Sequence, residues 1–333
     1  MNQRMRSVCI YIFLLLLLSG CFLEDEMVPR HEQGDVLEGS VAMGTLYGVQ
    51  AYYDLRSNQV AASGPVTGWD LSFACAPDDW TIRLNSANFM YAGNSNDTSF
   101  QQELSLEALD MLFDASHGDP DSTAIGRWVE QTEDSTWSLR HVYLVDRGTD
   151  EEGIPRGVVK IQFETAGTDY LLRFANNGSS VETTYEIHRD PEQDRIYFSF
   201  EQGVVDVAPQ PDRWSLFFTK YTTMLVTNEG ENYPYIVCGV LLNPEGTAAA
   251  LDTIHEFSEI AIADTASLEL TPRADVIGYE WKYYNFDAGV YTIVPGMSYV
   301  IRDRDGFYYK LRFVDFYNDT GEKGNPVFEY VRL

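Results

Sequence analysis

The sequence is poor in cysteine, histidine and basic residues. It has four cysteines, five histidines and 23 Lys and Arg residues against 51 Asp and Glu residues, so its formal net charge is −28. A surface this acidic repels a phosphate backbone, which excludes nucleic acid as a partner. The patterns Gly-x-Ser-x-Gly and His-Glu-x-x-His and the phosphate loop are absent, and no carboxylate pair is singled out by its spacing. We therefore expect no enzyme.

Only Cys75 and Cys238 remain once the N-terminal segment is set aside. They are too far apart in the sequence, and too differently spaced, to be a metal-binding pair. An oxidising compartment would permit a disulfide between them. Buried free thiols are the interpretation we favour, and the disulfide stays open.

The N-terminus carries a secretion signal. Arg4 and Arg6 precede an apolar run over residues 8–18, which ends in Leu-Ser-Gly directly before Cys21. This pattern predicts a signal peptide over residues 1–20 and resembles a bacterial lipobox, in which the cysteine is acylated and becomes the first mature residue. The alternative is an ordinary cleaved signal with an incidental Cys21.

The segment after Cys21 is polar and acidic. Glu24, Asp25 and Glu26 form a run that resembles the export signals of lipoproteins on the outer face of the outer membrane, although a solvated charge run is the alternative. The lack of periodicity predicts a tether over residues 21–45. We expect an outer-membrane lipoprotein exposed at the cell surface.

The rest of the chain favours β-structure. Aromatic residues make up 14% of the sequence, and 21 residues are tyrosine, a type that suits pleated surfaces. Residues 298–333 predict an antiparallel meander, because Leu311 and Phe313 alternate with Lys310 and Arg312 between turn-forming segments. One face of this meander should pack on a core.

Several motifs recur in the same order. A Tyr- or Phe-centred strand is followed by Trp69 in one half and by Trp214 in the other, at a constant spacing, and later segments also echo each other. We interpret this as two related β units, at residues 46–190 and 191–333. Residues 104–112 and 251–260 have apolar spacing that predicts a short helical insertion in each unit.

These motifs, behind a lipobox, resemble the HmuY family. They are Tyr-Asp-Leu at residues 53–55, the Trp-Asp-Leu-Ser-Phe stretch within residues 68–73, residues 299–316 and residues 327–331. The resemblance implies an all-β, antiparallel HmuY-like fold and a surface lipoprotein of Bacteroidota. For well-known members it also implies capture of haem for a TonB-dependent outer-membrane receptor.

The resemblance also directs attention to haem ligands. Family members hold the iron through two histidines or two methionines, inside an apolar pocket. The candidate ligands in aromatic-rich segments are Met224, His255, Met297 and His141. His141 and Met297 each lie two residues before a tyrosine, so they occupy equivalent places in the two units. Each of the four also has a plain structural interpretation, as a core methionine or a hydrogen-bonded histidine.

The second unit matches the family more fully, so we expect the pocket there. Its candidate wall is Tyr221, Trp281, Tyr283 and Tyr284. The competing hypothesis is a module on the same fold that binds a glycan, a peptide or a receptor partner without haem, with tyrosine and tryptophan as stacking surfaces.

Overall fold

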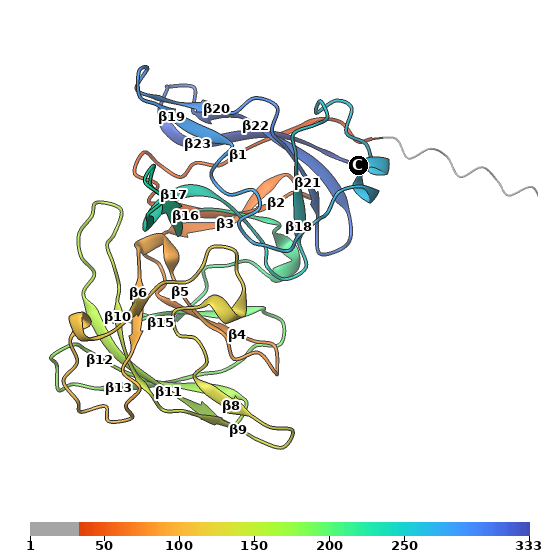
Figure 1. Ribbon diagram of the computed structural model, residues 1–333. Coiled ribbons are helices and arrows are strands. Elements are labelled where there is room, and N and C mark those ends of the chain that lie inside the picture. The colour runs from red at the N-terminus through yellow and green to blue at the C-terminus, as the bar shows by residue number, and fades with distance from the viewer. Residues whose placement is uncertain (1–32) are drawn as a thin grey trace, which may run out of the picture. The chain divides into compact units, whose positions relative to one another are not determined.

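The chain folds into antiparallel β-sheets (Figure 1). The computed structural model describes residues 33–333; the predicted signal peptide, Cys21 and the acidic run lie outside them. Within this range the helical elements are short 3₁₀ turns: η1 (Ser86–Asn88), η2 (Leu106–Ala108), η3 (Pro120–Ser122), η4 (Pro211–Arg213) and η5 (Ile262–Ala266). No helix among the described residues is long and apolar enough to cross a membrane. The all-β prediction is confirmed.

Two sheets form a first sandwich. Sheet A has the order β1 (Leu37–Ser40), β23 (Lys323–Arg332), β22 (Tyr308–Tyr317), β21 (Ser298–Arg302) and β18 (Ala248–Asp252). Sheet B has the order β17 (Asn232–Leu242), β16 (Leu216–Val226), β2 (Val49–Asp54) and β3 (Gln59–Pro65). Side chains of both sheets share one buried core, which includes Phe218, Tyr299 and Phe328.

Two further sheets form a second sandwich with a core of its own. Sheet C has the order β15 (Gly203–Val205), β14 (Arg195–Ser199), β4 (Leu71–Ala74) and β5 (Ile82–Leu84). Sheet D has the order β13 (Thr183–Ile187), β12 (Asp169–Asn176), β11 (Val158–Ala166), β10 (Val142–Asp146), β6 (Tyr91–Asn94) and β7 (Met111–Leu112). Two further hairpins lie outside these sheets. One pairs β8 (Val129–Gln131) with β9 (Thr136–Ser138), and the other pairs β19 (Lys282–Asn285) with β20 (Val290–Ile293).

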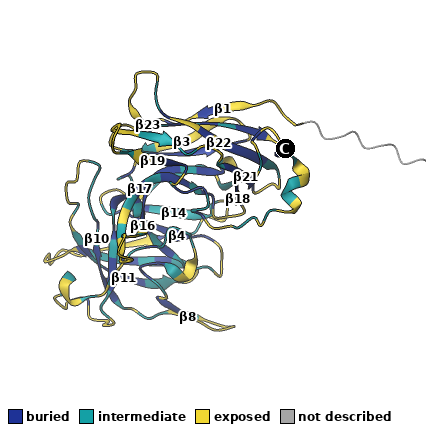
Figure 2. Ribbon diagram, turned by 45° about the horizontal axis from the view of Figure 1, so that its top comes forward, coloured by how far each residue is buried: buried dark blue, intermediate teal, exposed yellow. Residues whose placement is uncertain are grey.

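The predicted meander is confirmed as β21, β22 and β23. Leu311 and Phe313 of β22 are buried in the core while Arg312 between them is exposed. Lys310 departs from the predicted alternation: it is buried, and its Nζ donates to the Ile260 carbonyl at 2.9 Å. Phe313 stacks on Trp281 at 3.8 Å between ring centroids. Figure 2 shows the same contrast over the fold, with buried strands in dark blue and exposed loops and hairpin tips in yellow. Pro326 lies inside β23, where the pairing with β22 is irregular.

The first strands of each predicted unit pair with strands of the other unit. Strand β2 pairs with β16, with Tyr53 opposite Leu216, and β14 pairs with β4, with Phe198 opposite Leu71. The two pairings are related by a constant offset, since 216 − 71 and 198 − 53 are both 145. The strands therefore do not separate at residue 190: β1 to β3 complete the first sandwich, and β14 and β15 complete the second.

The two predicted tryptophan positions have matching surroundings. Trp214 packs edge-on against Tyr52 at 4.9 Å, and Trp69 packs edge-on against Tyr197 at 5.0 Å. Asn85 Nδ2 donates to the Trp69 carbonyl at 2.9 Å, and Asn243 Nδ2 donates to the Trp214 carbonyl at 3.2 Å. The duplication itself stays a prediction, and these matched contacts support it.

Two other predictions need correction. The tether does not extend to residue 45, because β1 pairs with β23 and both Val41 and Met43 are buried in the first core. The helical insertions are shorter than predicted: residues 106–108 form the 3₁₀ turn η2, and residues 251–260 contain no helix. Met111 lies in strand β7 and Leu251 in strand β18, because pairing with neighbouring strands outweighs a short apolar spacing.

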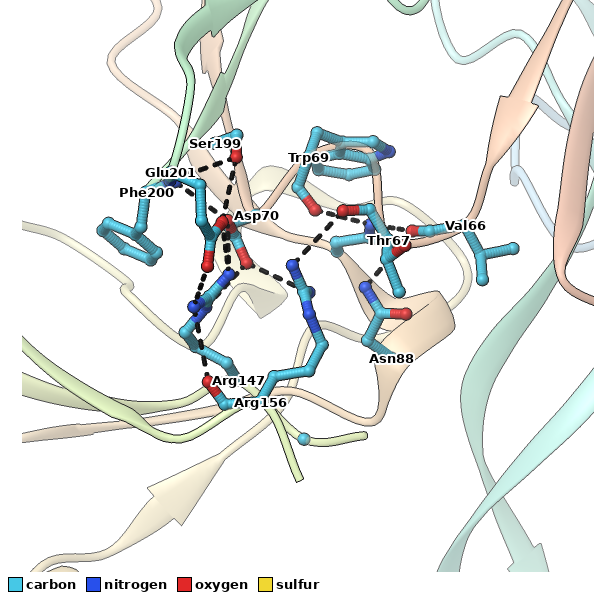
Figure 3. A network of polar contacts seen from close by, with 12 residues as sticks. Val66, Thr67, Trp69, Asp70, Asn88, Arg147, Arg156, Ser199, Phe200 and Glu201 are labelled. Atoms are coloured by element: carbon cyan, nitrogen blue, oxygen red, sulfur yellow. Dashed lines mark hydrogen bonds and ion pairs between the residues drawn. The ribbon is translucent and has the colours of Figure 1, made fainter. Parts of the chain in front are cut away.

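A buried ion network joins the exchanged hairpin β14–β15 to the second sandwich (Figure 3). Asp70 is fully buried, and its carboxylate accepts hydrogen bonds from Arg147 Nε at 3.0 Å and Nη2 at 3.1 Å. Arg147 Nη1 also pairs with Glu201, in the β14–β15 turn, at 2.6 Å, and Arg156 Nη1 lies 3.1 Å from Asp70. A buried arginine that loses its counter-charge is strongly destabilising.

We expect Asp70→Asn to lower the free energy of unfolding by about 3 kcal/mol, because it leaves Arg147 and Arg156 undercompensated. Urea unfolding measures this change. The control is Asp305→Ala, which removes a half-exposed partner of Arg56 and should change stability by less than about 1 kcal/mol. Equal small losses in both variants would contradict this view of the network.

A second buried charge lies in the first sandwich. Lys282 Nζ donates to the Cys238 carbonyl at 2.6 Å and lies 4.0 Å from the centre of the Trp281 ring. Burial lowers the pKa of Lys282 to about 8. Cys238 itself is a free thiol, and so is Cys75.

The lowered pKa of Lys282 predicts that the free energy of unfolding depends on pH. The folded chain releases the Lys282 proton near pH 8 and the unfolded chain near its ordinary pKa of 10.5, so the unfolded state binds more protons between these values. The free energy of unfolding of the wild type, relative to Lys282→Met, should therefore rise with pH across this window. Urea titrations of both proteins from pH 7 to 10 test it, and a difference that stays flat or falls would refute it.

Candidate ligand-binding site

A cavity with mainly apolar walls contains one of the predicted ligands, Met224, and we name it the Met224 cavity. Its volume is about 730 Å³, within the range of about 300–1,000 Å³ that is usual for small-molecule sites. The large apolar and aromatic side chains of its wall are Tyr91, Met111, Leu112, Phe113, Met224 and Pro234.

One wall comes from sheet D. Met111 of β7 lies opposite Gly93 of β6, and a Cβ atom built on Gly93 would lie 2.7 Å from Met111 Sδ. The glycine thus leaves the space that the thioether occupies. Tyr91, on the same strand as Gly93, packs edge-on against Phe113 at 5.8 Å.

The facing wall comes from sheet B. Met224 of β16 lies opposite Pro234 of β17, and directly opposite residues in an antiparallel pair share one face of the sheet. Proline is tolerated here because β17 is the edge strand of sheet B. The Met224 side chain stays 47% exposed, so the thioether is accessible.

Polar groups close another side of the cavity. Ser116 Oγ donates to Asp275 at 2.7 Å and lies 3.1 Å from Thr223 Oγ1. Arg273 pairs with Asp275 at 3.0 Å, and its side chain remains 58% exposed. Arg273 is therefore a cation at the wall of the cavity that a ligand carboxylate can reach.

His117 also lines the cavity, but its hydrogen bonding does not favour ligation. Its Nδ1 accepts the backbone N–H of Asp119 at 3.2 Å. In the neutral imidazole the proton then sits on Nε2, which leaves neither nitrogen with a free lone pair. The thioethers of Met111 and Met224 are the donors better suited to a soft metal centre.

Comparison with known proteins supports the motif resemblance. The family described as "HmuY protein" matches residues 191–330. Over these residues the chain is similar to the HmuY family. No curated protein matches the sequence.

Solved structures of the HmuY type are remote from this chain. Apo PinO from Porphyromonas gingivitis has 12% identity over 89% of this chain and 96% of its own, with a TM-score of 0.28. The apo HmuY analog (TFO) of Tannerella forsythia has 11% identity over 91% of this chain and 98% of its own, with a TM-score of 0.26.

The four candidate ligands for a HmuY-type haem site do not lie together. Met297 lines a different cavity of about 290 Å³ with Tyr221 and Tyr299. His255 follows β18 and pairs through Nδ1 with Asp252 at 2.9 Å; this hydrogen bond raises the pKa of His255. His141 Nδ1 accepts from Asn94 at 3.2 Å. Of the four, only Met224 shares a cavity with a second thioether.

The candidate pocket wall is not assembled either. Trp281 is buried in the first core and Tyr221 is buried beside the cavity of Met297. Tyr283 and Tyr284 are half-exposed on β19. The sequence reasoning missed Met111, because the apolar spacing of residues 104–112 was interpreted as a helix. Gly93, whose missing side chain makes room for Met111, carries no signal in the sequence.

Proposed function

We propose that this protein, which is similar to the HmuY family over residues 191–330, is a lipid-anchored surface protein that binds a flat, apolar, carboxylate-bearing ligand of the porphyrin class in the Met224 cavity. One observation carries the proposal: Met111 and Met224, from different sheets, line one cavity of small-molecule size. The donor set fits haem, because thioether sulfurs are known axial ligands of haem iron. Met111 and Met224 would hold the iron, and Arg273 would pair with a carboxylate of the ligand.

This function is binding rather than catalysis. The family resemblance makes a TonB-dependent receptor the expected recipient of the ligand. It also makes the outer membrane the expected location, with a lipid on Cys21 as the anchor. Both stay proposals alongside the haem site.

A non-haem binding module is the second candidate, and the β19–β20 hairpin favours it. Phe286 is 87% exposed at this hairpin, and its ring packs edge-on against Tyr284 at 5.1 Å. Tyr284 in turn packs against Tyr291 of β20 at 5.1 Å. An exposed aromatic surface of this kind suits a glycan or a protein partner.

A haemin titration of the mature protein tests the first candidate. We expect a Soret shift that saturates near one equivalent, and at least tenfold weaker binding in both Met111→Ala and Met224→Ala. The matched control is Met297→Ala, which removes the same side chain from the other cavity and should bind as the wild type does. The spectrum should also persist below pH 6, because a thioether does not protonate where imidazole does, near pH 6.5.

Two results would count against the haem site. Equal affinities in all three methionine variants would remove the Met224 cavity from the proposal. No saturable shift in the wild type would favour the non-haem module, for which Phe286→Ala is the next variant to examine.

Anchoring is tested separately. Cys21→Ala should move the protein from the membrane fraction to the soluble fraction, because the acyl chains supply the membrane affinity through their buried methylene groups. The measurement is fractionation followed by detection of the protein. An unchanged membrane fraction would refute the lipoprotein assignment.

A further inference from the structure

A cluster of three potential metal ligands lies at one end of the β12–β13 pair, on the sheet D side of the molecule. The residues are Asp169, at the start of β12, and Glu186 and His188, at the end of β13. Within residues 33–333 this is the one group of three or more His, Cys, Asp or Glu side chains whose ligand atoms approach closely enough for a shared ion.

The strand register explains why these side chains converge. Tyr170 lies opposite Ile187, so the next position in the ladder brings Asp169 opposite His188. Glu186 and His188 are two residues apart, and side chains at this spacing point to the same face of a strand. Ile187 between them points the other way and is fully buried. The three polar groups therefore share the solvent face.

The spacing of the ligand atoms suits a first-row divalent metal. His188 Nδ1 lies 2.8 Å from Asp169 Oδ2 and 4.0 Å from Glu186 Oε1, and all three atoms lie within 4.8 Å of one another. Bonds of about 2.0–2.2 Å in a tetrahedral site place ligand atoms about 3.4 Å apart. The separation of 2.8 Å is that of the His188–Asp169 hydrogen bond, which a bound ion would replace, and the separation of 4.0 Å is longer than this value.

The surroundings also favour a site. Asp169 Oδ1 accepts the backbone N–H of Arg189 at 2.9 Å, which fixes the carboxylate and turns Oδ2 toward His188. Support of this kind from a neighbouring group is typical of metal ligands. The side chains of His188 and Glu186 are 70% and 52% exposed, so an ion has open access.

We propose that Asp169, Glu186 and His188 form a surface site for Zn²⁺ or a similar divalent transition metal, with the fourth position open to water. The imidazole nitrogen and two carboxylate oxygens are borderline donors that suit Zn²⁺. The ion would link β12 to β13, the edge strand of sheet D. This site is separate from the Met224 cavity and does not depend on haem binding.

The chain contains a matched control. His255 pairs with Asp252 at 2.9 Å, almost as His188 pairs with Asp169, but this pair has no third ligand within reach. A metal that needs only one His–Asp pair would bind both places. A metal that needs the third ligand would bind only at His188.

The test is calorimetric titration of the mature protein with ZnCl₂ at pH 7.5, in millimolar Mg²⁺ to occupy isolated surface carboxylates. We expect one saturable Zn²⁺ equivalent in the wild type and in His255→Ala, and at least tenfold weaker binding in His188→Ala and Glu186→Gln. Zn²⁺ should also raise the melting temperature of the wild type but not of His188→Ala.

These substitutions are at exposed positions, so circular dichroism without metal should give the same melting temperature for Glu186→Gln as for the wild type. The proposal is overturned if the wild type shows no saturable Zn²⁺ binding. It is also overturned if His188→Ala binds Zn²⁺ as tightly as His255→Ala does.

Discussion

Strand pairing between the two halves of the chain is the constraint on which the rest of this structure depends. Strand β2 enters sheet B beside β16, and β14 enters sheet C beside β4. Each sandwich is therefore completed by strands from the other half of the sequence, and each core contains side chains from both halves. Separating the two halves of the sequence would expose the edges of β16 and β4 that pair with β2 and β14.

The Met224 cavity follows from this arrangement. Its two thioethers come from β7 in the second sandwich and β16 in the first. Ser116 and Asp275 join the same two regions through a hydrogen bond at 2.7 Å. A ligand held between Met111 and Met224 would therefore contact both sandwiches at once.

The sequence predicted the strands better than their partners. Alternation along residues 307–316 was enough for β22, because a period of two is a local property. The exchange of β2 and β14 could not be read from any local pattern, since pairing depends on residues more than a hundred positions away. The constant offset between Trp69 and Trp214 pointed to related environments, and the matched aromatic contacts agree with it.

The site was predicted less well than the fold. Met224 was chosen because it follows an aromatic-rich strand, and it does line a cavity. His255 and His141 were chosen on the same grounds, but neither lines the Met224 cavity. Met111 was missed because its neighbour across the ladder, Gly93, matters only once β6 and β7 are paired.

The central claim is that the ligand lies between the two sandwiches, and amide hydrogen exchange with and without haemin tests it most directly. The account predicts slower exchange on both sides of the cavity together, over residues 91–117 and 223–234, with little change around Met297 or the β19–β20 hairpin. Slower exchange confined to one side, or centred on Met297 or Phe286, would contradict it.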